Sequence, residues 1–304
     1  MVASIALIDG TGVVDAGDYD NEMRNGYDNT NNRCINKTSF INKIYDLCNN
    51  RAGDGSVRIA AQYFRGPGQA GPAQSGRTCA SILEDVKAWY KSNPEFAKGP
   101  IFAAGYSRGG YIAIEYAKWL GEQGLNVKSL FLFDAVERDC SVDIARESKT
   151  PYKEAMWYVA PSAALAERIS QFFHNSPIPG NVQIAYHAVR DPSVYSRWYF
   201  DNCGLDGVVV IEKFKATHAA MGGIPWTGDH PVVPQFDLKQ GLKAGWEAVK
   251  SGQVLLPLGM QMTAGKVAAN SVKLVPTTTE KQDFEASDKV WAWMSNKLKI
   301  YQVI

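Results

Sequence analysis

A serine lies between small residues in the stretch GYSRGG, residues 105–110. The apolar run at 100–105 predicts a buried strand before it, and the periodic pattern at 111–124 predicts a helix after it. Small residues let a strand and a helix meet in a tight turn, which presents Ser107 outward. The first N–H groups of the helix then face any negative charge that develops nearby. The spacing therefore predicts a nucleophilic serine that attacks a carbonyl carbon.

The pattern G-x-S-x-G between a strand and a helix is typical of the nucleophile elbow of α/β hydrolases. Gly105 and Gly109 would keep side chains away from the crossing of strand and helix. Glycine-rich turns also occur without catalysis, so the motif alone is a weak signal. Here the flanking patterns match on both sides, which favours catalysis over a purely structural turn.

A serine nucleophile needs a base, and the chain has only four histidines. His174 lies in a predicted insertion, His187 inside a predicted strand and His230 in a loop rich in Pro and Gly. His218 follows the predicted strand at 208–214 and comes after Ser107 in the chain, which is the order expected of a hydrolase triad. We therefore predict that His218 is the base.

The acid of the triad has two candidates. Asp134 ends the predicted strand after the elbow helix, and Asp191 ends the next strand. Both lie between Ser107 and His218 in the chain and near the carboxyl edge of the predicted sheet. The residues alone leave the choice between them open.

Short apolar runs alternate with helical patterns along the chain. Strands are predicted at 4–10, 57–64, 100–105, 127–136, 182–189 and 208–214, and helices at 79–93, 111–124 and 283–299. The strands are apolar on both faces, which predicts a mostly parallel sheet covered by helices. We expect one α/β domain over residues 1–304. It carries a lid-like helical insertion at 140–180 and a C-terminal extension at 252–304.

Composition and spacing argue against nucleic-acid binding and against a metal site. The chain has 304 residues and a net charge of +1, which gives no electrostatic support for nucleic-acid binding. The Asp- and Asn-rich stretch 12–39 lacks the spacing of an EF-hand, so a solvated loop is favoured over a calcium site. We predict no metal and no cofactor.

The cysteines and the N-terminus give expectations about the cellular compartment. Five cysteines are scattered without a C-x-x-C pair, and the odd count favours a reducing compartment over a dense disulfide framework. The start MVASIALIDGTG lacks a basic segment, and no apolar run approaches the roughly 18 residues of a membrane span. We expect a cytoplasmic protein, with export by a route that reads no signal peptide left open.

Several motifs together resemble the α/β-hydrolase domain of the type VI secretion phospholipase effectors and their uncharacterised relatives. LIDGTG (7–12) is similar to the opening F-D-G-T-x-N, GYSRGG (105–110) to the elbow G-x-S-R-G-A, and FDAV (133–136) to W-D-T-V. THAAMGG (217–223) is similar to G-x-H-x-D-V-G-G, although Ala220 replaces its aspartate. The resemblance implies a Ser-Asp-His triad of Ser107, Asp134 and His218. Asp191 stays as the alternative acid.

The resemblance also gives the first strand a role. In a minimal hydrolase of this kind, the loop after that strand provides one donor to the oxyanion hole. Backbone N–H groups at Gly10 or Thr11, together with that of Arg108, would then form the hole. A tight turn in which Asp9 caps backbone amides is weighed equally.

The expected function is that of a serine esterase or lipase acting on carboxylic esters. The resemblance implies lipid esters, mainly phospholipids, as substrates, so contact with a membrane surface is compatible with it. Two alternatives stay open, a non-catalytic binding module on a hydrolase scaffold and a peptidase or amidase with the same triad. Beyond a small-molecule or lipid ester, the sequence predicts no partner, and it leaves the oligomeric state undetermined.

Overall fold

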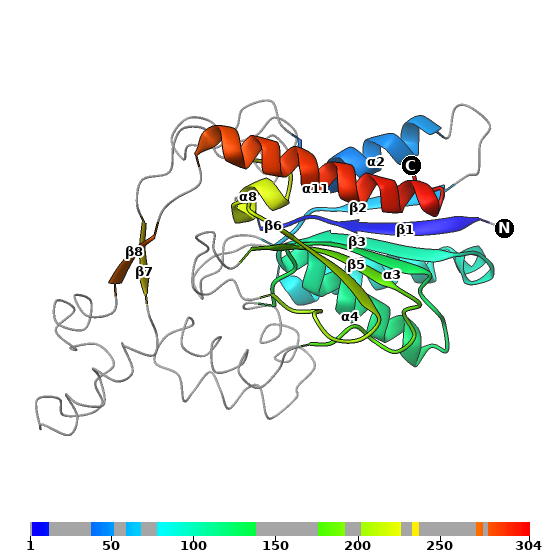
Figure 1. The fold of residues 1–304 in the computed structure, drawn as a ribbon. Helices are drawn as coiled ribbons and strands as arrows, with labels where there is room; N and C mark the ends of the chain where they lie inside the picture. The colour runs from blue at the N-terminus through cyan, green and yellow to red at the C-terminus, as the bar shows by residue number, and fades with distance from the viewer. Residues whose placement is uncertain are drawn as a thin grey trace, which may run out of the picture.

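Six strands form the main sheet of the computed structural model, which describes residues 2–11, 38–51, 59–67, 78–137, 176–191, 202–225, 233–236, 272–275 and 279–304. The strands are β1 (Ala3–Ile8), β2 (Ile59–Phe64), β3 (Ile101–Tyr106), β4 (Ser129–Phe133), β5 (Ala185–Arg190) and β6 (Val209–Phe214). They are all parallel and lie in the order β2-β1-β3-β4-β5-β6 (Figure 1). The carboxyl ends of β1, β3, β4 and β5 therefore meet at one edge of the sheet.

Helices cover both faces of this sheet. Helices α3 (Cys79–Lys91) and α4 (Arg108–Glu122) lie on one face, and α2 (Phe40–Arg51) and α11 (Glu280–Ile300) lie on the other (Figure 1). The short helix α8 (His218–Met221) follows β6, and a 3-10 turn, η2 (Pro94–Lys98), precedes β3. Two further strands, β7 (Val233–Phe236) and β8 (Val272–Val275), form a separate antiparallel pair.

The buried strands are apolar on both faces because each face has its own core. In β1, Ala6 and Ile8 pack with residues of α3 and α4, whereas Ile5 and Leu7 pack with residues of α2 and α11. A strand covered on both sides reads as a continuous apolar run, which is the pattern expected in a parallel sheet. In contrast, β6 is an edge strand that is largely exposed.

The predicted fold class, an α/β-hydrolase-like parallel sheet flanked by helices with a C-terminal helix, is confirmed. Two element boundaries, the end of β4 and the start of α4, differ from the predicted ones. The predicted strand at 127–136 ends at Phe133, because Asp134 adopts a left-handed backbone conformation with φ of 47°. The elbow helix begins at Arg108, three residues before the expected start. Helix α2 and the pair β7–β8 were not predicted.

Some predictions fall largely outside the described residues. The lid-like insertion at 140–180 is described only from residue 176, and the Asp- and Asn-rich stretch 12–39 only from residue 38. Of the extension 252–304, the structure describes 272–275 and 279–304. The single domain and its insertion therefore stay predictions.

The state of three cysteines bears on one expectation. Cys79, the first residue of α3, is disulfide-bonded, whereas Cys48 and Cys203 are buried free thiols. A disulfide at Cys79 weakens the argument from the odd cysteine count, and the reducing compartment stays a prediction. The physical reason is simple, since an odd total excludes only the pairing of every cysteine.

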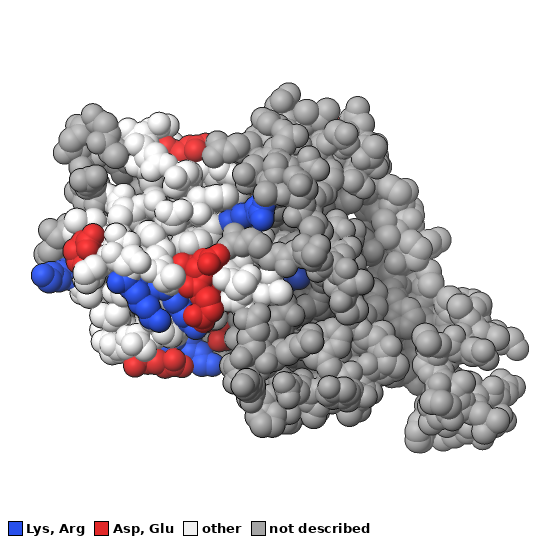
Figure 2. All heavy atoms as spheres, turned by 180° about the vertical axis from the view of Figure 1, so that it is seen from behind, with Lys and Arg blue, Asp and Glu red and all other residues white. Residues whose placement is uncertain are grey.

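The surface and helices of the described part match the composition. On the face shown in Figure 2, acidic and basic side chains lie next to one another, as a net charge near zero suggests. Among the described residues, no helix has both the length and the apolar character needed to cross a bilayer.

The junction of β3 and α4 leaves no space for a side chain at Gly109. A Cβ atom there would lie 2.3 Å from the carbonyl oxygens of both Ile8 and Asp9, which are backbone atoms of β1 and its loop. At Gly105, a Cβ atom would lie 2.4 Å from the carbonyl oxygen of Gly109. The elbow glycines therefore let α4 pack directly on β1 and β3.

We predict that Gly109→Ala lowers the free energy of unfolding by about 3 kcal/mol, because the new methyl group forces the backbone of β1 to move. Alanine has the higher helix propensity, so the clash must outweigh a gain of about 1 kcal/mol. Gly180→Ala is the control, since no atom lies within 4 Å of a Cβ there. Urea denaturation measures both, and equal stability of the two variants would contradict the packing described here.

Candidate active site

Ser107 occupies a strained turn at the carboxyl end of β3. Its φ is 55° and its ψ is −128°, a conformation that a residue with a side chain rarely adopts. Its backbone N–H donates to the carbonyl of Phe133, and its own carbonyl accepts from Gly110 and Val136. These hydrogen bonds hold the turn on both sides, so the backbone that carries the Ser107 hydroxyl is fixed in position.

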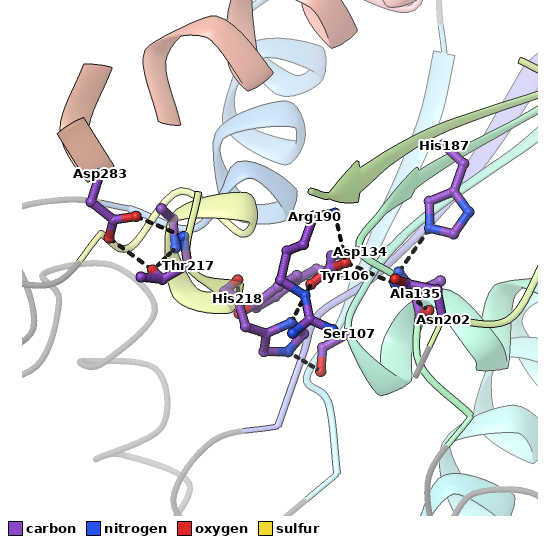
Figure 3. Close-up of polar contacts among 11 residues, drawn as sticks. Tyr106, Ser107, Asp134, Ala135, His187, Arg190, Asn202, Thr217, His218 and Asp283 are labelled. Carbon is purple, nitrogen blue, oxygen red and sulfur yellow. Dashed lines mark hydrogen bonds and ion pairs between the residues drawn. The ribbon is translucent and has the colours of Figure 1, made fainter. Parts of the chain in front are cut away.

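His218 connects the serine to a carboxylate (Figure 3). Its Nε2 lies 2.9 Å from Ser107 Oγ, and its Nδ1 lies 2.6 Å from Asp134 Oδ2. The carboxylate can only accept, which assigns the proton of the neutral ring to Nδ1 and leaves Nε2 to accept from the serine hydroxyl. The geometry thus brings together a hydroxyl, a base and an acid in one hydrogen-bonded row.

Asp134 is fully buried and is held by several donors. Asn202 Nδ2 donates to its Oδ1 at 2.7 Å, and the backbone N–H of Arg190 donates to the same oxygen at 3.2 Å. The side chain of Arg190 forms an ion pair with Oδ2, the oxygen that also contacts His218. Burial alone would raise the pKa of Asp134, but the Arg190 charge and the hydrogen bonds from His218 and Asn202 hold it well below its usual value.

The alternative acid, Asp191, is one residue beyond the end of β5, and its backbone N–H donates to the carbonyl of Phe214. Both ring nitrogens of His218 are engaged, one by Ser107 and one by Asp134. The ring therefore offers no nitrogen to a second carboxylate, and the geometry favours Asp134 over Asp191.

Tyr106 contacts His218 through both its ring and its hydroxyl group. Its ring packs against the His218 ring with centroids 5.2 Å apart, and its hydroxyl donates to the carbonyl of His218 at 3.0 Å. A Cβ atom at Gly222 would lie 2.3 Å from this ring, and one at Gly10 would lie 2.6 Å from it. The glycines on both sides make room for Tyr106, so the x of the G-x-S-x-G motif has a specific task here.

Asp9 organises the loop after β1. Its Oδ1 accepts from the N–H of Gly10 at 2.8 Å, and its Oδ2 accepts from Ser39 Oγ at 2.5 Å and from Tyr63 Oη at 2.9 Å. Burial raises the pKa of Asp9 to about 6, although these hydrogen bonds act in the opposite direction. The N–H of Gly10 is thus engaged by Asp9, which is the capped turn that was weighed against an oxyanion role for this loop.

Arg108 ties the elbow to the same loop. Its side chain is buried, and its Nε donates to Thr11 Oγ1 at 2.7 Å. Its backbone N–H belongs to the first residue of α4, where helical N–H groups have no acceptor within the helix. The Arg108 side chain thus links its own residue to Thr11, which are two of the three residues predicted as oxyanion donors.

His187 supports the acid from within β5. The N–H of Ala135 donates to its Nε2 at 3.0 Å, and its Nδ1 lies 3.3 Å from the carbonyl of Gly204. The ring is therefore neutral, with its proton on Nδ1. Burial lowers the pKa of His187 to about 4, against the smaller raising effects of Asp134 and Gly204. By holding the N–H of Ala135, His187 fixes the left-handed turn at Asp134.

Sequence reasoning missed Arg190, Asn202 and the positioning role of Tyr106. Arg190 directly precedes the candidate Asp191 at the carboxyl end of β5, so its place at the active edge of the sheet was the available signal. Asn202 lies in an irregular segment that reaches the site through a bridge to Val136, and its sequence neighbours give no signal.

A metal centre finds no support in the part of the chain that the structure describes. No three His, Cys, Asp or Glu side chains there form a group that could hold an ion. Of the predicted loop at 12–39, where a calcium site was considered, the structure describes only residues 38 and 39.

Comparisons with known proteins give one family and a set of solved structures. The thioesterase domain family matches residues 69–172, about a third of the chain, which include Ser107 and Asp134 but not His218. No curated protein matches the sequence. Solved structures at low identity include the NocB thioesterase domain of the nocardicin cluster, mouse α/β hydrolase domain-containing protein 10 and an esterase from Pyrobaculum calidifontis.

The similarity to these structures is limited. NocB has 13% identity and a TM-score of 0.32, with 72% of this chain and 86% of that chain covered. The mouse protein has 13% identity and a TM-score of 0.35, with 72% and 82% covered. The Pyrobaculum esterase has 14% identity and a TM-score of 0.37, with 72% and 69% covered.

We predict that His187 makes the stability depend on pH between about 6.5 and 4. The unfolded chain takes up a proton near the ordinary pKa of 6.5, whereas the folded chain resists it down to about 4. The contribution of His187 to the free energy of unfolding should therefore fall as the pH falls through this window, by about 3 kcal/mol at most, whereas the raised pKa of Asp9 acts in the opposite direction in both proteins. In His187→Gln, whose amide oxygen can accept from Ala135, this part of the slope should disappear. Urea titrations at several pH values measure it, and parallel curves for the two proteins would contradict the prediction.

Proposed function

We propose that this protein is a serine hydrolase that cleaves carboxylic esters, with Ser107 as nucleophile, His218 as base and Asp134 as acid. The observation that carries the proposal is the hydrogen-bonded row of these residues, with contacts of 2.9 Å and 2.6 Å. A triad is recognised by such geometry and roles, whatever the fold that presents it.

In the acylation step, His218 Nε2 takes the proton of Ser107 Oγ as the oxygen attacks the ester carbonyl carbon. The carbonyl oxygen gains negative charge and is stabilised by the N–H groups of Arg108 and Thr11. The protonated His218 then gives its proton to the leaving alcohol as the C–O bond breaks. Ser107 now carries the acyl group.

In the deacylation step, water takes the place of the alcohol. His218 removes a proton from the water, the resulting hydroxide attacks the acyl carbon, and the same N–H groups stabilise the second tetrahedral intermediate. The proton returns through His218 to Ser107 Oγ, which leaves the free carboxylic acid and the original enzyme.

Asp134 and Arg190 act on the base in opposite directions. The carboxylate holds Nδ1 protonated and stabilises the imidazolium that forms in each step. Arg190 shares the Oδ2 oxygen of Asp134, and its positive charge disfavours a second cation on the adjacent ring.

Lipid esters, and phospholipids in particular, are the substrate class that we infer from the motifs shared with the secreted phospholipase effectors. The thioesterase family match over residues 69–172 supports acyl thioesters as a second class. Both substrates carry an acyl chain, and the same attack on a carbonyl carbon serves for either. The choice between them depends on how the leaving group is recognised.

Strain argues against a non-catalytic role for this site. Ser107 and Asp134 both have positive φ values, which cost roughly 1–3 kcal/mol each. A binding module would need neither this strain nor a buried carboxylate beside the histidine. An amidase would use the same residues, and it differs only in the leaving group that His218 must protonate.

We predict that a fluorophosphonate probe labels Ser107 and that Ser107→Ala abolishes both labelling and hydrolysis of p-nitrophenyl butyrate. His218→Ala and Ser107→Ala should each lower kcat by about 10³-fold or more, because nucleophile and base act as one unit. Asp134→Asn should lower it by up to about 10⁴-fold, because the wrong tautomer of His218 is then favoured.

Matched controls separate these roles from general damage. Asp191→Asn and His230→Ala change the same residue types but no member of the proposed triad, and both should keep most of the activity. A folded Ser107→Ala protein with full activity would overturn the mechanism. Parallel assays on acyl-CoA thioesters and on phosphatidylcholine vesicles then decide the substrate class.

We predict that Arg190→Gln moves the acidic limb of the kcat/KM profile to higher pH. Removing a cation next to the imidazole favours its protonated form, so the base is lost at a higher pH. Arg190→Lys keeps the charge and should keep the limb in place. Asn202→Ala removes a neutral donor from the same carboxylate and should lower the rate with little shift. An unmoved limb in Arg190→Gln would exclude this electrostatic effect.

A further inference from the structure

The base stands on a very short helix. Helix α8 spans only His218–Met221, with Thr217 as its N-cap residue, whose Oγ1 accepts from the N–H of Ala220 at 3.2 Å. A helix of one turn has almost no stability of its own, so contacts with the rest of the fold must set its orientation. The direction of the His218 side chain depends on those contacts.

Asp283 makes the closest of these contacts from the first turn of α11 (Figure 3). Its Oδ1 accepts from the N–H of Thr217 at 2.7 Å, and its Oδ2 accepts from Thr217 Oγ1 at 2.7 Å. The carboxylate is fully buried, and both of its oxygens serve the residue directly before His218. Such a two-point contact fixes the position and the rotation of the N-cap residue.

A second contact follows one turn along α11. Ser287 Oγ donates to the carbonyl of Ala220 at 2.8 Å. Helix α11 therefore holds the backbone on both sides of His218, while Tyr106 holds the carbonyl of His218 itself from the sheet. The three contacts leave the histidine turn little freedom to shift relative to Ser107.

Burying a carboxylate where a helix packs against the fold is energetically unfavourable. Burying a charge costs several kcal/mol before its contacts compensate, and an apolar residue often stabilises such a position as well or better. Of the other buried positions of α11, four are apolar, namely Ala286, Val290, Met294 and Leu298, and two are the serines Ser287 and Ser295. Asp283 alone among these buried positions carries a charge, and it lies where the helix meets the histidine turn.

We propose that Asp283 is a positioning residue for the base, acting on His218 through Thr217. The proposal rests on the function proposed above, because positioning matters only if His218 takes part in the reaction. Displacing a catalytic group by about 1 Å can cost about 10²-fold in rate. Asp283 thus contributes to kcat from a part of the chain far in sequence from the triad.

The test compares Asp283→Asn with Leu298→Ala, a change in the last turns of the same helix that removes buried apolar contacts. Both are assayed with p-nitrophenyl butyrate under conditions where each is fully folded. Asp283→Asn should lower kcat by about 10- to 100-fold with KM within about twofold. Leu298→Ala should keep the kcat of the wild type, although it destabilises the fold.

Thr217 provides the reciprocal variants. Thr217→Val removes the hydroxyl and should cause a loss similar to that of Asp283→Asn, and the double variant should lose no more than either single one. Thr217→Ser keeps the hydroxyl and should restore most of kcat. Additive losses, or a Thr217→Ser variant as slow as Thr217→Val, would contradict the coupling.

A spectroscopic measurement makes the result independent of turnover. The Nδ1 proton of His218, held against Asp134, should give a far-downfield proton NMR signal in the wild type and in Leu298→Ala. It should be lost or broadened in Asp283→Asn. A persistent signal together with unchanged kcat overturns the proposal. If the wild type shows the signal but neither hydrolyses esters nor reacts with the probe, the proposed function fails, and the signal alone then decides the role of Asp283.

Discussion

The site depends on keeping a negative charge inside the protein. Asp134 is fully buried and must stay ionised to hold Nδ1 of His218 protonated. A lone buried carboxylate would take up a proton instead, because low-dielectric surroundings disfavour the charge. Arg190, Asn202 and a backbone N–H prevent this, and His187 stays neutral nearby so that it can accept from Ala135. The surrounding polar residues are thus consequences of one buried charge.

Backbone hydrogen bonds connect the two strained turns at Ser107 and Asp134. The N–H of Ser107 donates to Phe133, and the carbonyl of Ser107 accepts from Val136, so the two residues that flank Asp134 and Ala135 both bond to the elbow. Each left-handed turn is therefore held by the other. This arrangement explains how two unfavourable backbone conformations persist side by side, since strained residues last only where their surroundings determine them several times over.

Local patterns made much of this architecture predictable. The strand, the elbow and the helix around Ser107 follow from glycine spacing and hydrophobic periodicity, and His218 and the two candidate acids, Asp134 and Asp191, follow from their places after strands. Arg190, Asn202 and Asp283 escaped because their roles arise from contacts across the sheet edge, which no local pattern encodes. Asp283 even began the predicted helix at 283–299, yet only the packing of α11 against the histidine turn gives its carboxylate a partner. The choice between Asp134 and Asp191 likewise needed the geometry of the ring nitrogens.

The contacts that assemble the site join segments far apart in the chain. Ser107 and His218 are separated by 111 positions, His218 and Asp134 by 84, and Thr217 and Asp283 by 66. Loops of such length close slowly, because their ends must meet before any contact compensates for the lost chain entropy. We therefore expect the hydrogen-bonded row to be among the last interactions that form as the polypeptide folds. Recovery of reactivity at Ser107 after denaturation would consequently trail the burial of tryptophan and mark the arrival of the native state.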